Sequence, residues 1–178
     1  MELHQEVGPL RTSISAIAER AGVERLTVYR HFPDDDALFA GCSGVHAELH
    51  PLPEPAVWRG TAEPAERTRL GLGALYGYYA RTRSMQSNLE RDVDHVAALA
   101  RILKPFSDYL ADLAEDLASA WHSGDPMTLA VARHATRFAT WHSLDREGVS
   151  DAAKVTLVTR WLGSVSREPA ISLEPGRV

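Results

Sequence analysis

The chain has 178 residues, of which 44% are hydrophobic, and its formal net charge at pH 7 is −5. This apolar content is too high for a disordered chain, and the length allows one or two compact cores that need no disulfide or metal to hold them together. No apolar run is long enough to cross a membrane, the N-terminus lacks the basic and apolar stretches of a secretory signal, and the single Cys42 cannot form an internal disulfide. We therefore expect a cytoplasmic globular protein without a membrane partner.

Residues 13–39 predict two short helices that meet at a tight turn. Four apolar residues recur at the spacing of one helical face, namely Ile14, Ile17, Ala18 and Ala21. Thr12 or Ser13 can cap the start of this first helix with a side-chain oxygen. Gly22 stands where the helix must stop, because a residue without a Cβ atom takes a positive φ at little cost. The turn is therefore expected at residue 22.

After the turn, Val23 restarts the apolar pattern, and Val28 and Phe32 are the next residues expected to be buried. Six positions between them are expected to be exposed: Arg25, Leu26, Thr27, Tyr29, Arg30 and His31. A short helix, a turn at glycine and a second helix with polar and aromatic residues form the helix-turn-helix arrangement, whose second helix enters the major groove of DNA. The alternative is an ordinary pair of helices that binds no nucleic acid.

Three motifs follow one another in this stretch: Ala18-x-x-Ala21-Gly22-Val23, then Thr27-x-Tyr29-x-His31-Phe32, then Ala37-Leu38-Phe39. Together they resemble the signature of TetR-type bacterial transcriptional repressors. Residues 138–165 are similar, more weakly, to the last two helices of one branch of that family. The resemblance implies a three-helix DNA-binding head, followed by a larger all-helical domain that binds an effector and forms a homodimer. It also implies that Thr27, Tyr29 and His31 hold the DNA backbone.

Two features depart from the pattern of that family. Only residues 1–7 precede Gly8, so the first helix of the head is expected to be short, or the start of the chain to be truncated. The first 50 residues hold four arginines and eight acidic residues, a net charge of −4, although DNA binding depends on neutralising phosphates. Asp35 stands where family members often have a lysine. We therefore expect one phosphate contact to be lost.

The rest of the chain predicts further helices. Residues 34–50 form a fourth helix that joins the two parts of the chain, and Pro51, Pro53 and Pro55 end it. Further helices are expected over residues 63–83, over 84–122 as a short and a long helix, over 126–146 and over 150–167. The sequence thus predicts an all-α fold, with a helix-turn-helix DNA-binding domain over residues 1–50 and a helical ligand-binding and dimerisation domain over residues 51–178.

By the resemblance, the effector is a small molecule bound in a cavity among the middle helices. Six residues are candidates for its lining: Tyr76, Tyr79, Phe106, His134, Phe138 and Trp141. Aromatic walls with a few polar groups are usual for such pockets, although each of these residues is more often part of a core. Three residues near the end of the chain are candidates for the dimer interface: Leu157, Trp161 and Val165. The alternative is that they fill the core of the monomer.

The sequence holds no glycine-rich phosphate loop, no HExxH motif, no nucleophile elbow and no group of ligands at zinc-site spacing. We therefore expect no enzyme activity, no cofactor and no metal. The predicted function is that of a ligand-responsive homodimeric TetR-type repressor, which a small-molecule effector of unknown identity releases from a palindromic double-stranded DNA operator. The alternative is a helical dimer that binds a small molecule or a protein and has weakened or lost its DNA binding.

Overall fold

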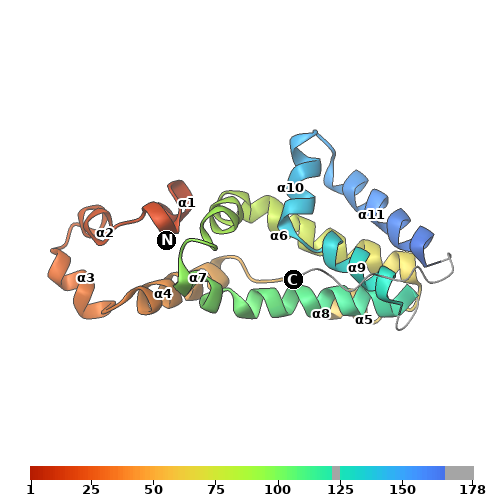
Figure 1. Ribbon diagram of the computed structural model, residues 1–178, viewed down its shortest axis with the longest axis horizontal. Coiled ribbons are helices and arrows are strands. Elements are labelled where there is room, and N and C mark those ends of the chain that lie inside the picture. The colour runs from red at the N-terminus through yellow and green to blue at the C-terminus, as the bar shows by residue number, and fades with distance from the viewer. Residues whose placement is uncertain (122–124, 167–178) are drawn as a thin grey trace. The chain divides into compact units, whose positions relative to one another are not determined.

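The computed structural model describes residues 1–121 and 125–166. These residues contain helices and no strand, which confirms the predicted all-α fold (Figure 1). In chain order the elements are α1 (Glu2–Glu6), the 3₁₀ turn η1 (Pro9–Arg11), α2 (Ile14–Ala21), α3 (Arg25–His31), α4 (Asp35–Leu49), α5 (Ala56–Arg59), α6 (Pro64–Asp92), α7 (Ala97–Ile102), α8 (Lys104–Trp121), α9 (Pro126–Ala135), α10 (Phe138–Arg146) and α11 (Asp151–Val165).

The chain forms two compact units, and α6 contributes to both. Unit 1 comprises residues 1–52 and 81–105; unit 2 comprises residues 53–80 and the chain from residue 106 onward, described as far as residue 166. The predicted domain boundary after residue 50 is close to the end of the first segment of unit 1. Residues 81–105, which the sequence placed in the second domain, belong to unit 1. The division of function between two domains stays a prediction.

Unit 1 holds the N-terminal helices together with the end of α6 and with α7. Helix α2 packs on α3, and α4 packs on α7. Phe39 of α4 forms a buried cluster with Ala98 and Leu99 of α7, and partly buried apolar residues of the segment 89–103 surround it. The first helix is short, as expected, because α1 has five residues and ends before Gly8, where φ is +90°.

Unit 2 has its core between the first half of α6 and α8, α9 and α11. Ala114 and Ala118 of α8 pack with Ala132 of α9 and Leu162 of α11, and all four are buried. On α6, Gly71 allows a close approach, because a Cβ atom there would lie 3.1 Å from a methyl of Leu117. The glycine at position 71 therefore serves the close packing of α6 and α8.

Two of the predicted helix boundaries are wrong. The helix predicted to end at residue 83 continues without a break to Asp92, since Met85, Asn88 and Asp92 are buried on this stretch and hold it in unit 1. The single helix predicted over residues 126–146 is two helices, α9 and α10, separated after Ala135. The break leaves the carbonyl oxygens of Ala135 and Thr136 without helical partners. The hydroxyl groups of Tyr76 and Tyr79 donate hydrogen bonds to these two oxygens.

Candidate nucleic-acid interface

Helix α2 begins and ends where the sequence predicts. The Ser13 hydroxyl oxygen accepts a hydrogen bond from the backbone N–H of Ala16 at 3.1 Å, which caps the start of the helix. At the other end Gly22 is left-handed, with φ 66° and ψ 32°. The backbone N–H of Val23 donates to the carbonyl of Ala18 at 3.0 Å, a bond that only a left-handed residue at position 22 permits. The turn therefore fixes the direction in which α3 leaves α2.

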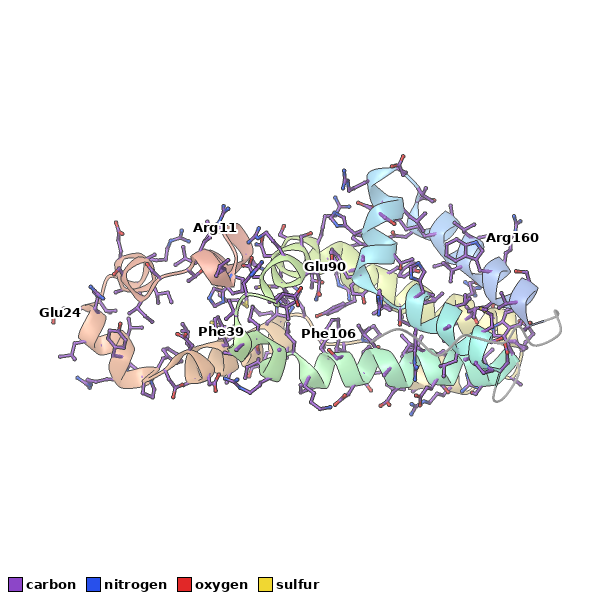
Figure 2. The ribbon with its side chains drawn as sticks, in the orientation of Figure 1. Arg11, Glu24, Phe39, Glu90, Phe106 and Arg160 are labelled. Carbon is purple, nitrogen blue, oxygen red and sulfur yellow. The ribbon has the colours of Figure 1, made fainter. Side chains whose placement is uncertain are left out.

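Helix α3 presents most of the predicted DNA-binding residues to solvent. Val28 is buried and anchors the helix, while Thr27 is half-buried. The other five predicted residues are exposed: Arg25, Leu26, Tyr29, Arg30 and His31. Arg25, Leu26, Tyr29 and Arg30 are spaced so that they share one side of a helix, and Leu26 is 69% exposed there. Glu24, labelled in Figure 2, lies at the turn that precedes this surface.

The arginines of α2 and α3 differ in whether they form ion pairs with acidic residues. Arg20 binds Glu6 through both terminal nitrogens, at 3.0 and 2.8 Å, and contacts Glu2 at 3.3 Å. The hydrogen bonds between Arg20 and Glu6 raise the pKa of Arg20 and lower that of Glu6, so these two groups stay ionised together. Within residues 1–121 and 125–166, Arg25 and Arg30 have no ion-pair partner. Their guanidinium groups therefore face solvent as the free positive charges of α3.

The acidic residues at the start of α4 have different roles. Asp34 caps the helix by accepting the N–H of Ala37 at 2.8 Å, and Asp36 receives two hydrogen bonds from Arg101 at 2.7 and 2.9 Å. Asp35 is exposed, and the described part of the chain gives it no partner. Part of the predicted acidity of the head is therefore neutralised within unit 1, while the charge of Asp35 is not.

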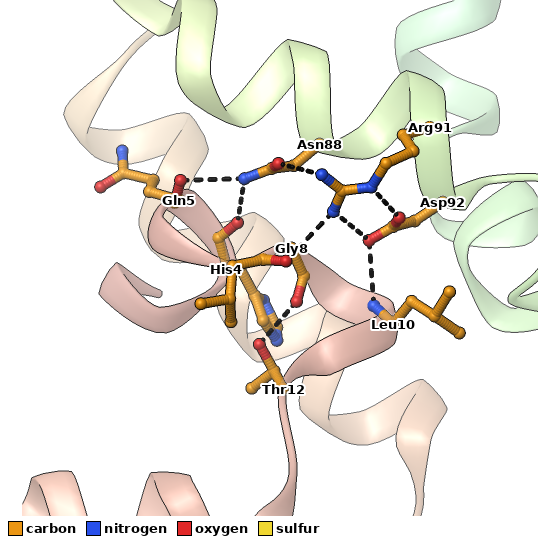
Figure 3. A network of polar contacts seen from close by, with 9 residues as sticks. His4, Gln5, Gly8, Leu10, Thr12, Asn88, Arg91 and Asp92 are labelled. Atoms are coloured by element: carbon orange, nitrogen blue, oxygen red, sulfur yellow. Dashed lines mark hydrogen bonds and ion pairs between the residues drawn. The ribbon is translucent and has the colours of Figure 1, made fainter.

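A polar network holds the N-terminal segment, which precedes α2 in the chain, to the end of α6 (Figure 3). Asp92, which is fully buried, accepts the N–H of Leu10 at 3.1 Å and two bonds from Arg91 at 2.7 and 3.1 Å. Burial by itself raises the pKa of Asp92, but the bonds from Arg91 and Leu10 outweigh it and hold this pKa below its usual 3.8. The sequence analysis did not identify this network, since it joins residues more than 80 positions apart.

The six predicted effector-lining residues do not form one group. Four are buried together: Tyr76, Tyr79, Phe138 and Trp141, with the rings of Tyr79 and Phe138 edge to face at 5.3 Å. Their polar atoms are already bonded, since the hydroxyl groups of Tyr76 and Tyr79 donate to backbone carbonyls and Trp141 Nε1 donates to Asp151 at 2.9 Å. Phe106 is half-buried against Tyr78, and His134 is exposed.

His134 lies instead with two of the predicted dimer residues. A groove of about 310 Å³ on α9 and α11 is lined by Ala130, Val131, His134, Trp161, Ser164 and Val165. Trp161 is 36% exposed, and Leu157 and Val165 are half-buried. The sequence analysis missed Ala130 and Val131, although their position one turn before His134 could have indicated a shared helical face.

Comparison with known proteins gives one match. The model of a family described as "Bacterial regulatory proteins, tetR family" matches residues 1–42. Neither the curated proteins nor the solved structures contain a match to the chain. None of the helices in the described ranges is long and apolar enough to cross a membrane, and those ranges hold no cluster of three or more metal-ligating side chains. The matched region contains α1 to α3 and the first half of α4.

Proposed function

We propose that this chain, a regulator of the tetR type by its N-terminal region, represses transcription as a homodimer that a small-molecule effector releases from a palindromic operator. The family match supports the coarser part, a DNA-binding transcriptional regulator. Repression, the dimer, the effector and the operator are the finer parts of the proposal.

The observation that carries the proposal is the free surface of α3. Arg25 and Arg30 have no ion-pair partner among the residues described, and Tyr29 is 45% exposed between them. Arginine binds guanine O6 and N7 in the major groove, and tyrosine hydroxyl groups bind phosphate oxygens. Helix α3 has seven residues, and the buried side chain of Val28 anchors its inner side. Such a helix can enter the major groove with its exposed side.

Dimer formation is needed because one short recognition helix makes few contacts. The proposed interface is the groove on α9 and α11, where Trp161 and Val165 offer apolar surface and His134 a polar rim. A partner on this groove would bury the exposed part of the Trp161 ring, which supports its choice as the interface. A two-fold dimer would place two α3 helices on half-sites roughly 34–36 Å apart, which corresponds to one turn of DNA.

For the effector we propose the buried aromatic residues of unit 2. The hydroxyl groups of Tyr76 and Tyr79 already donate to the carbonyls of Ala135 and Thr136, and a ligand that displaced these bonds would have to accept from both hydroxyl groups. It therefore needs hydrogen-bond acceptors of its own, since an unsatisfied buried hydroxyl group costs about 1–3 kcal/mol. An apolar ligand without acceptors is disfavoured at this position.

A second candidate function is a helical dimer that no longer binds DNA. The observation that favours it is the net charge of −4 over residues 1–50, including the exposed and unpartnered Asp35. Repulsion from phosphate weakens all DNA binding, whatever its sequence.

Selection of bound sequences from random duplex DNA, with the full chain, separates the two functions. A repressor should enrich an inverted repeat, and a gel shift should then show retention of that sequence over a scrambled duplex. The double variant Arg25→Ala, Arg30→Ala serves as the control, because it removes both free arginines of α3 and leaves buried Val28 in place. Equal, sequence-independent retention by the wild type and by this variant would exclude the repressor.

A further inference from the structure

We propose that unit 1 contains a binding site for a small, neutral, apolar molecule, in a cavity between α1, α2 and α4. This head cavity has a volume of about 660 Å³. Its apolar lining comes from the three helices and from the residue that follows α3: Leu3, Ile17, Phe32, Leu38, Val45 and Leu49. The site lies within unit 1 alone, so it differs from the effector site proposed in unit 2 and does not require DNA binding.

The head cavity leaves the apolar face of α2 incompletely covered. Ala18 of this face is buried, but Ile17 is half-buried and Ala21 is exposed. On the side of α4, Val45 is 47% and Leu49 is 61% exposed. Because removing apolar surface from water is favourable, an apolar molecule in the cavity would be stabilised by all of these side chains.

The size and shape of the head cavity suit a small molecule. Its walls come from different helices, so the surface is concave, and its volume falls within the range of about 300–1,000 Å³ that is usual for small-molecule sites. A Cβ atom at Gly41 of α4 would lie 2.8 Å from the ring of Phe32, so this ring packs directly on the α4 backbone and forms one wall. An apolar cavity of about 150 Å³ holds benzene, and this larger one can hold a molecule of roughly two or three rings.

The charges around the head cavity cancel. Arg20 binds Glu6 through both terminal nitrogens and contacts Glu2 at 3.3 Å. The N-terminal amine of Met1 adds a second positive charge on this side, so two positive and two negative charges meet there. Burial, and then this amine, lowers the pKa of His4 to about 4, so its imidazole is uncharged at neutral pH. A neutral ligand fits this balance, whereas an ion would lose hydration without gaining a counter-charge.

Cys42 gives a direct readout of occupancy. It lines the head cavity and is the single cysteine of the chain, so its reaction with N-ethylmaleimide reports on this site alone. We would titrate the full chain, without DNA, with N-phenyl-1-naphthylamine, a neutral apolar dye whose fluorescence rises in apolar surroundings. At saturating dye, Cys42 should react about tenfold more slowly or less, because the reaction requires access to the thiol.

Val45→Phe tests whether the dye occupies this cavity, since it adds a ring at the exposed end of the lining without removing a buried side chain. The dye concentration that gives half-protection of Cys42 should rise about tenfold or more. Ala47→Phe is the matched control, because it adds the same ring to an exposed position of α4 outside the lining. Its half-protection concentration should stay within about threefold of the wild type.

If circular dichroism shows that Val45→Phe does not fold, a benzyl group can be attached to Cys42 of the folded wild type through a mixed disulfide. Dye fluorescence should then fall, and dithiothreitol, which removes the benzyl group, should restore it.

A wild type whose Cys42 is not protected by the dye overturns the inference, as does equal protection in the wild type and in a folded Val45→Phe. Protection that appears without dye as the protein concentration rises would make a second copy of the chain the occupant, and it also overturns the inference. Since none of these measurements uses DNA, a failed selection of duplex sequences would count against the proposed function and not against this site.

Discussion

The ammonium group of Lys154 lies 4.5 Å from the centroid of the Trp141 ring, and both side chains donate to the same carboxylate oxygen. Trp141 Nε1 is 2.9 Å and Lys154 Nζ 2.7 Å from Asp151 Oδ1, and Lys154 also binds Asp145 at 2.9 Å. Lys154 is only 1% exposed. This contact joins α10 to α11 and fixes Trp141, which the sequence proposed as an effector contact.

Lys154→Met should destabilise unit 2 by about 1–3 kcal/mol, because it leaves Asp145 and Asp151 near each other without their cation. The cost stays below that of a fully buried pair, since both carboxylates are partly exposed. All four tryptophans belong to unit 2, so urea unfolding followed by tryptophan emission measures it. The double variant Lys154→Met, Asp151→Asn should recover part of the lost unfolding free energy. If the free-energy changes of the two substitutions simply add, Lys154 and Asp151 are not coupled.

His4 should make the stability of the head depend on pH. Burial, and then the nearby N-terminal amine, lowers the pKa of His4 from 6.5 to about 4. Since the unfolded chain binds the proton first, the stabilisation is complete above pH 6.5 and is lost as the pH falls from 6.5 towards 4, by up to about 3 kcal/mol. His4→Leu should flatten the profile of unfolding free energy in this window, measured by circular dichroism. Equal slopes for both proteins would mean that His4 titrates normally when folded.

Arg25→Ala should relax sequence preference at one symmetric pair of operator positions, at a cost of about 1–3 kcal/mol per contact, because arginine at the start of α3 can reach base edges. Repeated DNA selection with the variant measures this. Tyr29→Phe is the comparison, since a lost phosphate contact should weaken all sequences alike. An unchanged selected motif in Arg25→Ala would remove Arg25 from base reading.

Asp35→Lys should tighten binding to cognate and unrelated DNA alike, because the gain is electrostatic. Each new phosphate contact should steepen the log–log salt dependence by about 0.9, counted twice in a symmetric dimer. If Asp35 only favours the helix start, lysine instead costs a few tenths to about 1 kcal/mol of stability. Glu48→Lys, the same charge change at the other end of α4, is the control. Equal slopes for wild type and Asp35→Lys would show that Asp35 does not face DNA.

Trp161→Glu should dissociate the proposed dimer, because it places a charge in an apolar contact. Sedimentation velocity at several concentrations measures the effect. Thr156→Glu adds the same charge to an exposed position on another face of α11 and should leave the assembly unchanged. A Trp161→Glu protein that sediments as the wild-type dimer would place the interface elsewhere.

The sequence by itself determined the helix-turn-helix, because its signals are local. Ser13 caps α2 and Gly22 ends it within a few residues of the periodic pattern, and Val28 marks the buried side of α3. The exposure of Arg25 and Tyr29 follows from that same period. Each of these signals acts over one or two turns of helix, so no distant contact was needed to predict them.

Only the tertiary structure decided how far α6 runs, where α9 ends and which aromatic residues are buried. The reason is that these outcomes depend on partners far away in the chain: Tyr76 bonds to Ala135, and Asn88 to His4. A sequence pattern shows that Asp92 is polar, but not that Leu10 will offer it a backbone N–H within a buried site. Local periodicity therefore specified α3, and long-range pairing of buried polar groups specified how the N-terminal segment is held to α6.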